Sequence, residues 1–192
     1  MLSSRWFLFY RAIVITYPLS ISANWQSTSS VSDLSSAEQE WLFEPNSLTA
    51  KLKSKSQIFS VKVLSEQLFT LSPEQQNLLS CATQTAINRE VILLCDNVPM
   101  VYAQSWLPKS DASNPLHNIG ERPLGDVIFQ DPALKRTEIE IASFNFSHSI
   151  QQLVTLLNLP NRELLGRRSV FSLHEYQFLV CEVFLPGAYL YS

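Results

Sequence analysis

Glu182 is the one charged residue in the apolar run FLVCEVFL, residues 178–185. An unpaired buried carboxylate costs several kcal/mol, so this side chain requires a partner. A possible partner is Arg89, which stands in a similar run, INREVILLC, shortly before four aliphatic residues. If both runs are strands, each charge lies on a mostly apolar face and the two can line a small enclosed pocket. A structural ion pair, or an edge strand with its charges in water, would leave the same pattern.

Period-two alternation gives the expected neighbours of each charge. Arg89 shares its face with Ile87, Val91, Leu93 and Cys95, and Glu182 shares its face with Phe178, Val180, Phe184 and Pro186.

Short sequence motifs around these two runs follow one another in a specific order. They are Trp41-Leu42 with Asn46-Ser47-Leu48-Thr49, Arg89-Glu90-Val91, Arg122-Pro123-Leu124-Gly125 leading to Phe129, Arg136 with Ile139-Glu140-Ile141, Gly166-Arg167-Arg168-Ser169, and Glu182-Val183-Phe184-Leu185-Pro186 ending in Leu190-Tyr191. In this order the chain resembles the bacterial chorismate pyruvate-lyase family, which makes 4-hydroxybenzoate for ubiquinone synthesis. The similarity runs from roughly Trp25 to Tyr191, and the ordered set of motifs is far more specific than any single motif.

The resemblance implies an enzyme, a carbon-oxygen lyase that converts chorismate to 4-hydroxybenzoate and pyruvate. Loss of the enolpyruvyl ether with the neighbouring ring hydrogen makes the ring aromatic, so no cofactor is expected. The catalytic pair would be Arg89 and Glu182. Arg89 would bind the ring carboxylate, helped by the main-chain N–H of Leu124, and Glu182 would accept the hydrogen bond of the 4-hydroxyl, with the main chain of Leu48 closing that end.

One further role stays open at this stage. Arg167 or Arg168 would meet the enolpyruvyl carboxylate, or both would be solvated charges of a hairpin. Carboxylates suit guanidinium groups because a charge-assisted hydrogen bond is worth roughly 1.5–3 kcal/mol.

Composition fits one globular domain and excludes several other classes. The chain has 192 residues, of which 46% are hydrophobic and 16% charged. A net charge of -3 gives no basic surface for nucleic acid, and four glycines are too few and wrongly spaced for a dinucleotide or phosphate loop. We expect no nucleic-acid partner and a monomer, and the family resemblance implies the small molecules chorismate and 4-hydroxybenzoate as partners.

Cysteine and histidine give no sign of a metal site. Cys81, Cys95 and Cys181 are odd in number with no CxxC spacing, which indicates small buried side chains in a reduced compartment. The three histidines are scattered outside HxxxH or HExxH patterns. We predict no metal.

Residues 1–24 precede the resemblance, and we treat 25–192 as the chorismate-lyase-like domain. The segment has an aromatic and aliphatic stretch and a small-residue ending, as a secretory signal does, but Arg11 and Pro18 leave the apolar run short. It is far too short to span a membrane. We expect a cytoplasmic protein with an accessory or misplaced start; an exported binding protein cut near Ala23 is the alternative.

The remaining pattern predicts an α+β fold, an antiparallel sheet covered by helices. Three helices are expected after serine caps: Ser36, with Gln39 completing a capping box, for a helix through 43, Ser47 for one through 52, and Ser147 for one to about 157. Ser72-Pro73 opens a short helix to 79, and Pro123 starts one through 129. Strands are expected over 58–64, 87–95, 98–107, 136–146, 167–173 and 176–185, with hairpin turns at Asp96-Asn97 and His174-Glu175. Residues 108–120 read as a polar loop.

Three positions depart from the family pattern. Gln104 stands where members commonly have arginine, and Met100 and Leu165 stand where tryptophan is common. Loss of a positive charge near the site would weaken binding of a dianion. The same architecture also occurs in ligand-binding domains of transcription regulators, so a sensor of small aromatic acids is the alternative function, although no helix-turn-helix segment is evident.

Overall fold

An antiparallel sheet of eight strands forms the centre of the part of the chain that the structure describes. This computed structural model describes residues 14–80, 84–109, 116 and 119–192. The strands are β1 (Gln26–Ser27), β2 (Phe59–Thr70), β3 (Thr85–Cys95), β4 (Val98–Pro108), β5 (Lys135–Arg136), β6 (Glu140–Phe144), β7 (Leu164–Leu173) and β8 (Tyr176–Phe184). Their neighbour order is β1-β6-β7-β8-β4-β3-β2, and β5 pairs with β7. The predicted α+β architecture is confirmed.

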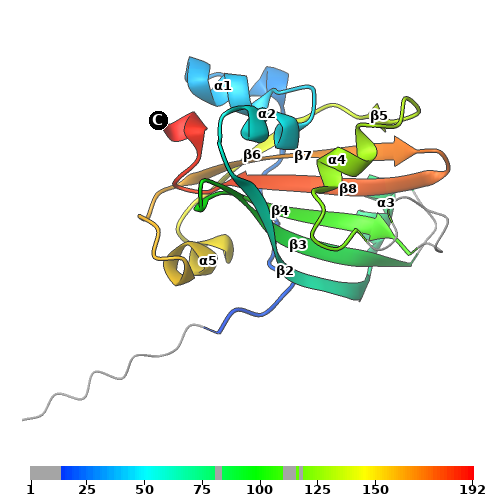
Figure 1. Cartoon of the computed structure of the whole chain (residues 1–192). Coiled ribbons are helices and arrows are strands. Elements are labelled where there is room, and N and C mark those ends of the chain that lie inside the picture. Colours follow the sequence, from blue (N-terminus) through cyan, green and yellow to red (C-terminus); the bar gives the residue numbers. More distant parts are fainter. Residues whose placement is uncertain (1–13, 81–83, 110–115, 117–118) are drawn as a thin grey trace, which may run out of the picture.

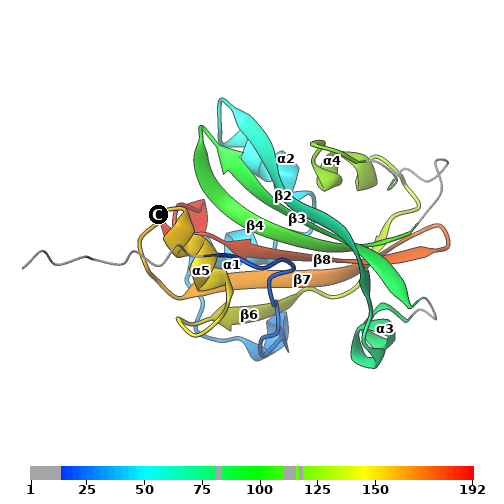
Figure 2. The same cartoon turned by 90° about the horizontal axis from the view of Figure 1, so that it is seen from below.

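Helices lie on both faces of this sheet (Figure 1 and Figure 2). They are α1 (Ser36–Leu42), α2 (Leu48–Ser54), α3 (Pro73–Leu79), α4 (Leu124–Ile128) and α5 (Ile150–Leu156). In Figure 1, α1, α2 and α4 lie above the sheet and α5 lies below it. We call these two sides the α2/α4 face and the α5 face.

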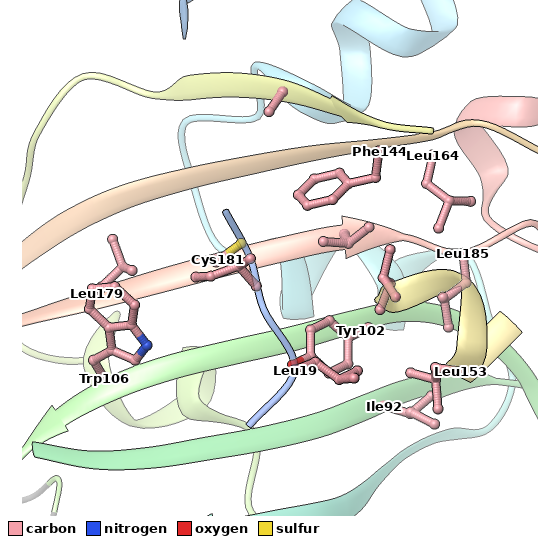
Figure 3. Packing of buried hydrophobic residues seen from close by; sticks show 14 of the residues in the cluster. Leu19, Ile92, Tyr102, Trp106, Phe144, Leu153, Leu164, Leu179, Cys181 and Leu185 are labelled. Atoms are coloured by element: carbon pink, nitrogen blue, oxygen red, sulfur yellow. The ribbon is translucent and has the colours of Figure 1, made fainter. Parts of the chain in front are cut away.

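Each face has its own apolar core. On the α2/α4 face, one cluster joins α1 and α2 to β3 and β4, and a second joins α4 to β7 and β8. On the α5 face, α5 and the segment 15–25 pack on the same strands from the other side. Figure 3 shows this second core, with Leu19 beside Tyr102 and Leu153 close to Ile92. Cys95 and Cys181 are fully buried, as predicted, whereas Cys81 lies outside the described residues.

The two long hairpins were predicted correctly because their turns carry strong local signals. Between β3 and β4, Asp96 and Asn97 both have positive φ, 50° and 65°, which is the conformation of a two-residue hairpin turn. Between β7 and β8, His174 has φ 54°. Asn, Asp and His tolerate this left-handed region better than most residues.

A β-bulge in the first hairpin changes which side chains face which side. Leu94 pairs with Pro99, but Leu93 pairs with Val101, so Met100 is an extra residue on β4. Pro99 has no N–H to donate to the ladder, and such residues favour bulges. Beyond the bulge, Arg89 pairs with Ser105 and Glu90 pairs with Gln104.

Several helix starts follow their predicted caps. The side chain of Ser47 accepts from Ala50 N–H at the start of α2, and Ser72 with Gln75 forms a capping box before Pro73 in α3. The expected cap at Ser36 was wrong by one residue. Ser35 accepts the Glu38 N–H, and the Glu38 carboxylate accepts the Ser35 N–H, so that pair closes the first turn of α1.

The expected strand over residues 136–146 was wrong in its continuity. It is two short strands, β5 and β6, which both pair with β7. The cap at Ser147 was also wrong, because its N–H and hydroxyl both donate to Asn145 Oδ1 and α5 begins later, at Ile150. The strand expected over 58–64 continues to Thr70 because β2 pairs with β3 along its whole length.

Residues 14–24, which precede the expected domain boundary, contact the α5 face. Leu19 and Ile21 are buried, at 3% and 8% exposure. Leu19 N–H donates to Glu90 Oε1 at 2.8 Å, and its carbonyl accepts from Gln104 Nε2 at 2.8 Å. Within the described residues, no helix is long and apolar enough to cross a bilayer.

Candidate active site

A small cavity of about 30 Å³ lies on the α2/α4 face, between the sheet and the first turns of α2 and α4. Its volume is close to that of a single water molecule. The lining residues come from both helices and from β5, β7 and β8: Asn46, Ser47, Leu48, Thr49, Leu124, Gly125, Ile128, Phe129, Arg136, Arg167, Phe171, Val180 and Glu182. Three of the four predicted site residues, Leu48, Leu124 and Glu182, are therefore together.

Glu182 is held by its neighbour across the strand pair. Arg167 pairs with Glu182 in the β7–β8 register, and its Nε donates to Glu182 Oε2 at 2.7 Å. The Nη1 of Arg167 donates to the carbonyls of Trp41, Leu42 and Glu44, which follow the end of α1. These carbonyls lack helical partners, so a fully buried guanidinium finds acceptors on two sides. Of the two carboxylate oxygens, only Oε2 has a hydrogen-bond partner among the described residues.

Arg136 is a second cation of this cavity. Its Nε donates to Ser169 Oγ at 2.9 Å, its Nη1 lies 3.2 Å from the carbonyl oxygen of Glu44, and the guanidinium stacks on Phe171. Burial, together with the nearby Arg167, lowers the pKa of Arg136 to about 10, although Glu182 opposes this shift. The group is still protonated at neutral pH. The sequence alone assigned no role to Arg136, although this residue stands in one of the ordered family motifs.

The main-chain groups of Leu48 and Leu124 stand at equivalent positions. Each is the first residue of its helix, where the N–H has no acceptor within the helix, and neither N–H has a partner among the described residues. Both side chains are buried, so only the backbone is available for polar contact with a ligand. Both N–H groups are thus available for the main-chain roles expected of the two residues, which stay predictions.

Gly125 permits the close approach of the two helix starts. A Cβ at this position would lie 2.8 Å from both Ser47 Oγ and Thr49 Oγ1, closer than side chains tolerate. Packing of α4 against α2 thus explains the glycine of the Pro123-Leu124-Gly125 motif.

Arg89 lies on the same face as Glu182 but outside the cavity lining. Its register partner is Ser105, which pairs in turn with Val180 of the cavity wall. The Nη2 donates to the carbonyls of Gly120 at 2.8 Å and Arg122 at 3.2 Å. The Nε lies 3.4 Å from Glu66 Oε2 but has no hydrogen-bond partner. Burial lowers the pKa of Arg89, and Glu66 opposes this shift.

Two sequence-based expectations about charge were therefore wrong. Arg89 and Glu182 are not partners, since each is paired with another charge. Gln104 does not remove a positive charge near the site, because the bulge at Met100 places it on the α5 face. Arg168 also points to the α5 face, where its Nε donates to Glu140 Oε2 at 2.8 Å. Of the two candidate arginines, Arg167 is the one at the cavity.

Comparison with known proteins agrees with this geometry. The family model described as chorismate lyase matches residues 19–192. The chain belongs to the chorismate lyase family. A relative from Pseudoalteromonas translucida, named probable chorismate pyruvate-lyase, is 73% identical over 180 residues, covering 93% of this chain and 100% of the relative. Another of the same name, from Psychromonas ingrahamii, is 40% identical and covers 93% of this chain and 98% of its own length.

Solved structures share the chorismate lyase fold at low identity. The effector domain of PhnF from Mycobacterium smegmatis has a TM-score of 0.52 and 14% identity, covering 73% of this chain and 88% of that domain. The ligand-binding domain of a GntR-family regulator from Bordetella bronchiseptica has a TM-score of 0.52 and 16% identity, covering 69% and 87%. At these identities the likeness extends to the fold alone.

Proposed function

We propose that this chorismate lyase family member is a chorismate pyruvate-lyase that forms 4-hydroxybenzoate and pyruvate. The observation that carries the proposal is the cavity itself. A carboxylate with one unpaired oxygen, two guanidinium groups and two main-chain N–H groups converge on a small enclosure, beside the polar side chains of Asn46, Ser47 and Thr49. Such an enclosure holds an anion in one pose and excludes water, which is what a reaction by positioning and electrostatics requires.

Each polar group has a proposed partner on chorismate. Glu182 accepts the hydrogen bond of the 4-hydroxyl through its unpaired oxygen, with the N–H of Leu48 at the same end. Arg89 and the N–H of Leu124 bind the ring carboxylate. Arg136 and Arg167 face the enolpyruvyl carboxylate, because they are the cations at the cavity.

Substrate binding requires the closed site to enlarge. The cavity of about 30 Å³ cannot hold a ring, and Arg89 is occupied by the Gly120 and Arg122 carbonyls. These carbonyls come just before α4, whose first residue is Leu124. A ring carboxylate would replace them on Arg89 as α4 moves away from the sheet. Release of product would need the same opening.

The chemistry needs no oxidant or reductant. The C–O bond of the enolpyruvyl ether breaks, the ring loses the hydrogen from the carbon that carries the hydroxyl, and the enolpyruvyl group gains a hydrogen to become pyruvate. Formation of the aromatic ring drives the reaction. Glu182 holds the hydroxyl, and the arginines hold the two carboxylates while the bond breaks.

We also propose a cytoplasmic monomer. Burial of Leu19 and Ile21 supports this location, because cleavage near Ala23 would remove two residues of the α5-face core. Mass spectrometry of the protein purified from its native cells tests the location, because it shows at which residue the mature chain starts. A mature chain that starts at or after residue 24 would refute the proposal.

The test of the function uses the full chain, because residues 14–24 belong to the packed core. Purified protein is mixed with chorismate, and 4-hydroxybenzoate and pyruvate are followed together. Equimolar products above the spontaneous rate, lost in Arg89→Ala but kept in Lys62→Ala on β2, are expected. Saturable binding of 4-hydroxybenzoate without turnover would identify a sensor instead and overturn the proposal.

A further inference from the structure

A second and larger cavity, of about 740 Å³, lies on the α5 face, away from the proposed active site. It is bounded by the segment 18–25, by α3, and by side chains of β2, β3, β4 and β7. We call it the α5-face cavity. Its volume lies within the range typical of small-molecule sites. The sheet separates it from Glu182, so a ligand here would not touch the residues proposed for catalysis.

The floor of the α5-face cavity carries a buried acceptor without a partner. Asn88 is fully buried, and its Oδ1 has no hydrogen-bond partner. Its Nδ2 donates to Glu90 Oε2 at 3.0 Å. A carboxylate can only accept, so this contact fixes the amide with nitrogen toward Glu90 and leaves the oxygen unpaired in a residue that lines the cavity.

The polar groups next to Asn88 already have hydrogen-bond partners of their own. Glu90 also accepts the Leu19 N–H and the Tyr102 hydroxyl. The indole N–H of Trp106 donates to Gln104 Oε1 at 3.1 Å. Trp106 therefore offers only carbon atoms to a ligand. Buried acceptors in proteins nearly always have a donor, from the protein, from water or from a ligand.

Aromatic side chains flank this acceptor. Trp106 pairs with Asn88 across β3 and β4, and Phe69 packs against Trp106 with ring centroids 5.8 Å apart. Leu78 of α3 completes this end of the cavity. An aromatic ring placed here would contact apolar surface on its sides and could give one hydrogen bond to the floor.

The charged groups of the α5-face cavity lie at other places. Arg168 is three strands away from Asn88, about 14 Å at the usual strand spacing, and leans toward Glu140 and Trp25. A single-ring ligand at Asn88 does not reach it. Glu74 is exposed at the rim, where water screens its charge. The end of a ligand that points away from Asn88 can therefore keep a solvated carboxylate.

We propose that the α5-face cavity binds a small phenol, with its hydroxyl donating to Asn88 Oδ1 and its ring packed against Trp106 and Phe69. The product of the proposed reaction, 4-hydroxybenzoate, belongs to this class. The choice of this compound as a probe rests on the proposed function, whereas the site does not.

Equilibrium dialysis of the full chain against 4-hydroxybenzoate tests the proposal. Wild type should bind two molecules per chain, and Leu78→Trp, which places an indole in the wall of the cavity and leaves Asn88 in place, should bind one. Leu156→Trp, on the exposed side of α5, is the matched control and should keep both. Leu78→Trp should also retain chorismate turnover within about twofold. Benzoate, which lacks the donor, should bind at this site about tenfold more weakly, equivalent to about 1.4 kcal/mol.

Glu182→Gln separates this proposal from the proposed function. If both hold, Glu182→Gln binds one molecule and the double variant with Leu78→Trp binds none. If only the phenol site is real, wild type binds one molecule, which Leu78→Trp loses and Glu182→Gln keeps. The phenol site is overturned if Leu78→Trp binds as many molecules as wild type, if benzoate binds there as tightly as 4-hydroxybenzoate, if Leu156→Trp loses a molecule as Leu78→Trp does, or if Arg168→Gln loses one.

Discussion

The Nε of Arg167 lies 2.7 Å from Oε2 of Glu182, its direct neighbour across β7 and β8. This ion pair positions the carboxylate in the cavity wall and occupies only one of its oxygens. Arg167 is itself anchored by the carbonyls that follow α1. The pair thus connects α1, two central strands and the proposed hydroxyl-binding position.

Glu182→Gln should lower chorismate turnover by about 10²–10⁴-fold, because Arg167 keeps the amide oxygen and the NH2 group, a donor, then takes the position of the oxygen that accepts from the 4-hydroxyl. Glu140→Gln is a matched control, since Glu140 pairs with Arg168 in the same way, at 2.8 Å, on the α5 face. The control should retain turnover within about twofold. Steady-state kinetics with product detection measures both. Equal loss in the two variants would mean that carboxylate–arginine pairs matter here only for folding.

Arg136→Gln should raise the KM for chorismate about tenfold or more, because a charge-assisted hydrogen bond to a carboxylate is lost. Inhibition by 4-hydroxybenzoate should change little, since this product lacks the enolpyruvyl carboxylate. Arg168→Gln, a change of the same charge on the other face, should leave KM unchanged. Inhibition constants for 4-hydroxybenzoate, measured together with the KM for chorismate, distinguish an effect on substrate binding from an effect on product binding. If product binding weakens as much as substrate binding, Arg136 does not read the enolpyruvyl group.

Gly125→Ala should impair the site through packing. The added Cβ would lie 2.8 Å from Ser47 Oγ, so α4 must move away from α2 or the side chains must shift, at a cost of about 1–3 kcal/mol. Gly187→Ala is the control, because its Cβ would lie 2.7 Å from Val98 Cγ1, far from the cavity lining. Both should lower the free energy of unfolding in urea, but only Gly125→Ala should also lower kcat/KM. Equal kinetic effects would refute the packing role.

The sequence predicted the hairpins and most helix starts because those features depend on a few adjacent residues. Asp96-Asn97 specifies a two-residue turn, and Ser72 before Pro73 specifies a helix start. The face of Gln104 could not be predicted in the same way. Simple counting from the turn pairs Arg89 with Gln104, and the extra residue Met100 shifts this pairing by one. One bulge therefore moves a whole strand segment to the other face.

The partners of the predicted charges depend on contacts that no local pattern contains. Arg167 was one of two adjacent arginines, and only its register with Glu182 places it at the cavity. The Nη2 of Arg89 donates to carbonyls more than thirty residues later, at Gly120 and Arg122. The family resemblance selected Leu48, Leu124 and Glu182 correctly as residues that lie together, yet Arg136 needed the fold to be found.

Leu19→Ala should lower the free energy of unfolding by about 2–5 kcal/mol, the usual cost of removing a buried leucine side chain. Leu19 is 3% exposed on the α5 face, and its main chain binds Glu90 and Gln104. Val14→Ala, at a position that is 80% exposed, should change it by less than about 0.5 kcal/mol. Urea unfolding followed by tryptophan fluorescence gives both values. A Leu19 variant as stable as wild type would mean that the segment contributes nothing to folding.

Tyr191 should make stability fall at alkaline pH. Its hydroxyl accepts the Leu165 N–H at 2.8 Å and donates to the Phe184 carbonyl at 3.2 Å, and burial raises its pKa to about 12. In the unfolded chain a tyrosine has a pKa of about 10. Below pH 10 the stabilisation is fully present; between pH 10 and 12 the unfolded chain loses the proton while the folded chain keeps it, so the free energy of unfolding falls by up to about 1.4 kcal/mol per pH unit.

Tyr191→Phe isolates this contribution from those of Tyr102 and Cys181, whose pKa values burial also raises. The variant should be less stable than wild type at pH 8, by about 1 kcal/mol for the lost hydrogen bonds. Its free energy of unfolding should then decline less steeply above pH 10, so that the two curves approach each other by pH 11. Urea titrations at each pH provide the curves. Parallel curves would show that Tyr191 ionises equally easily in the folded and unfolded chain, and that its burial next to Leu165 does not hold the proton.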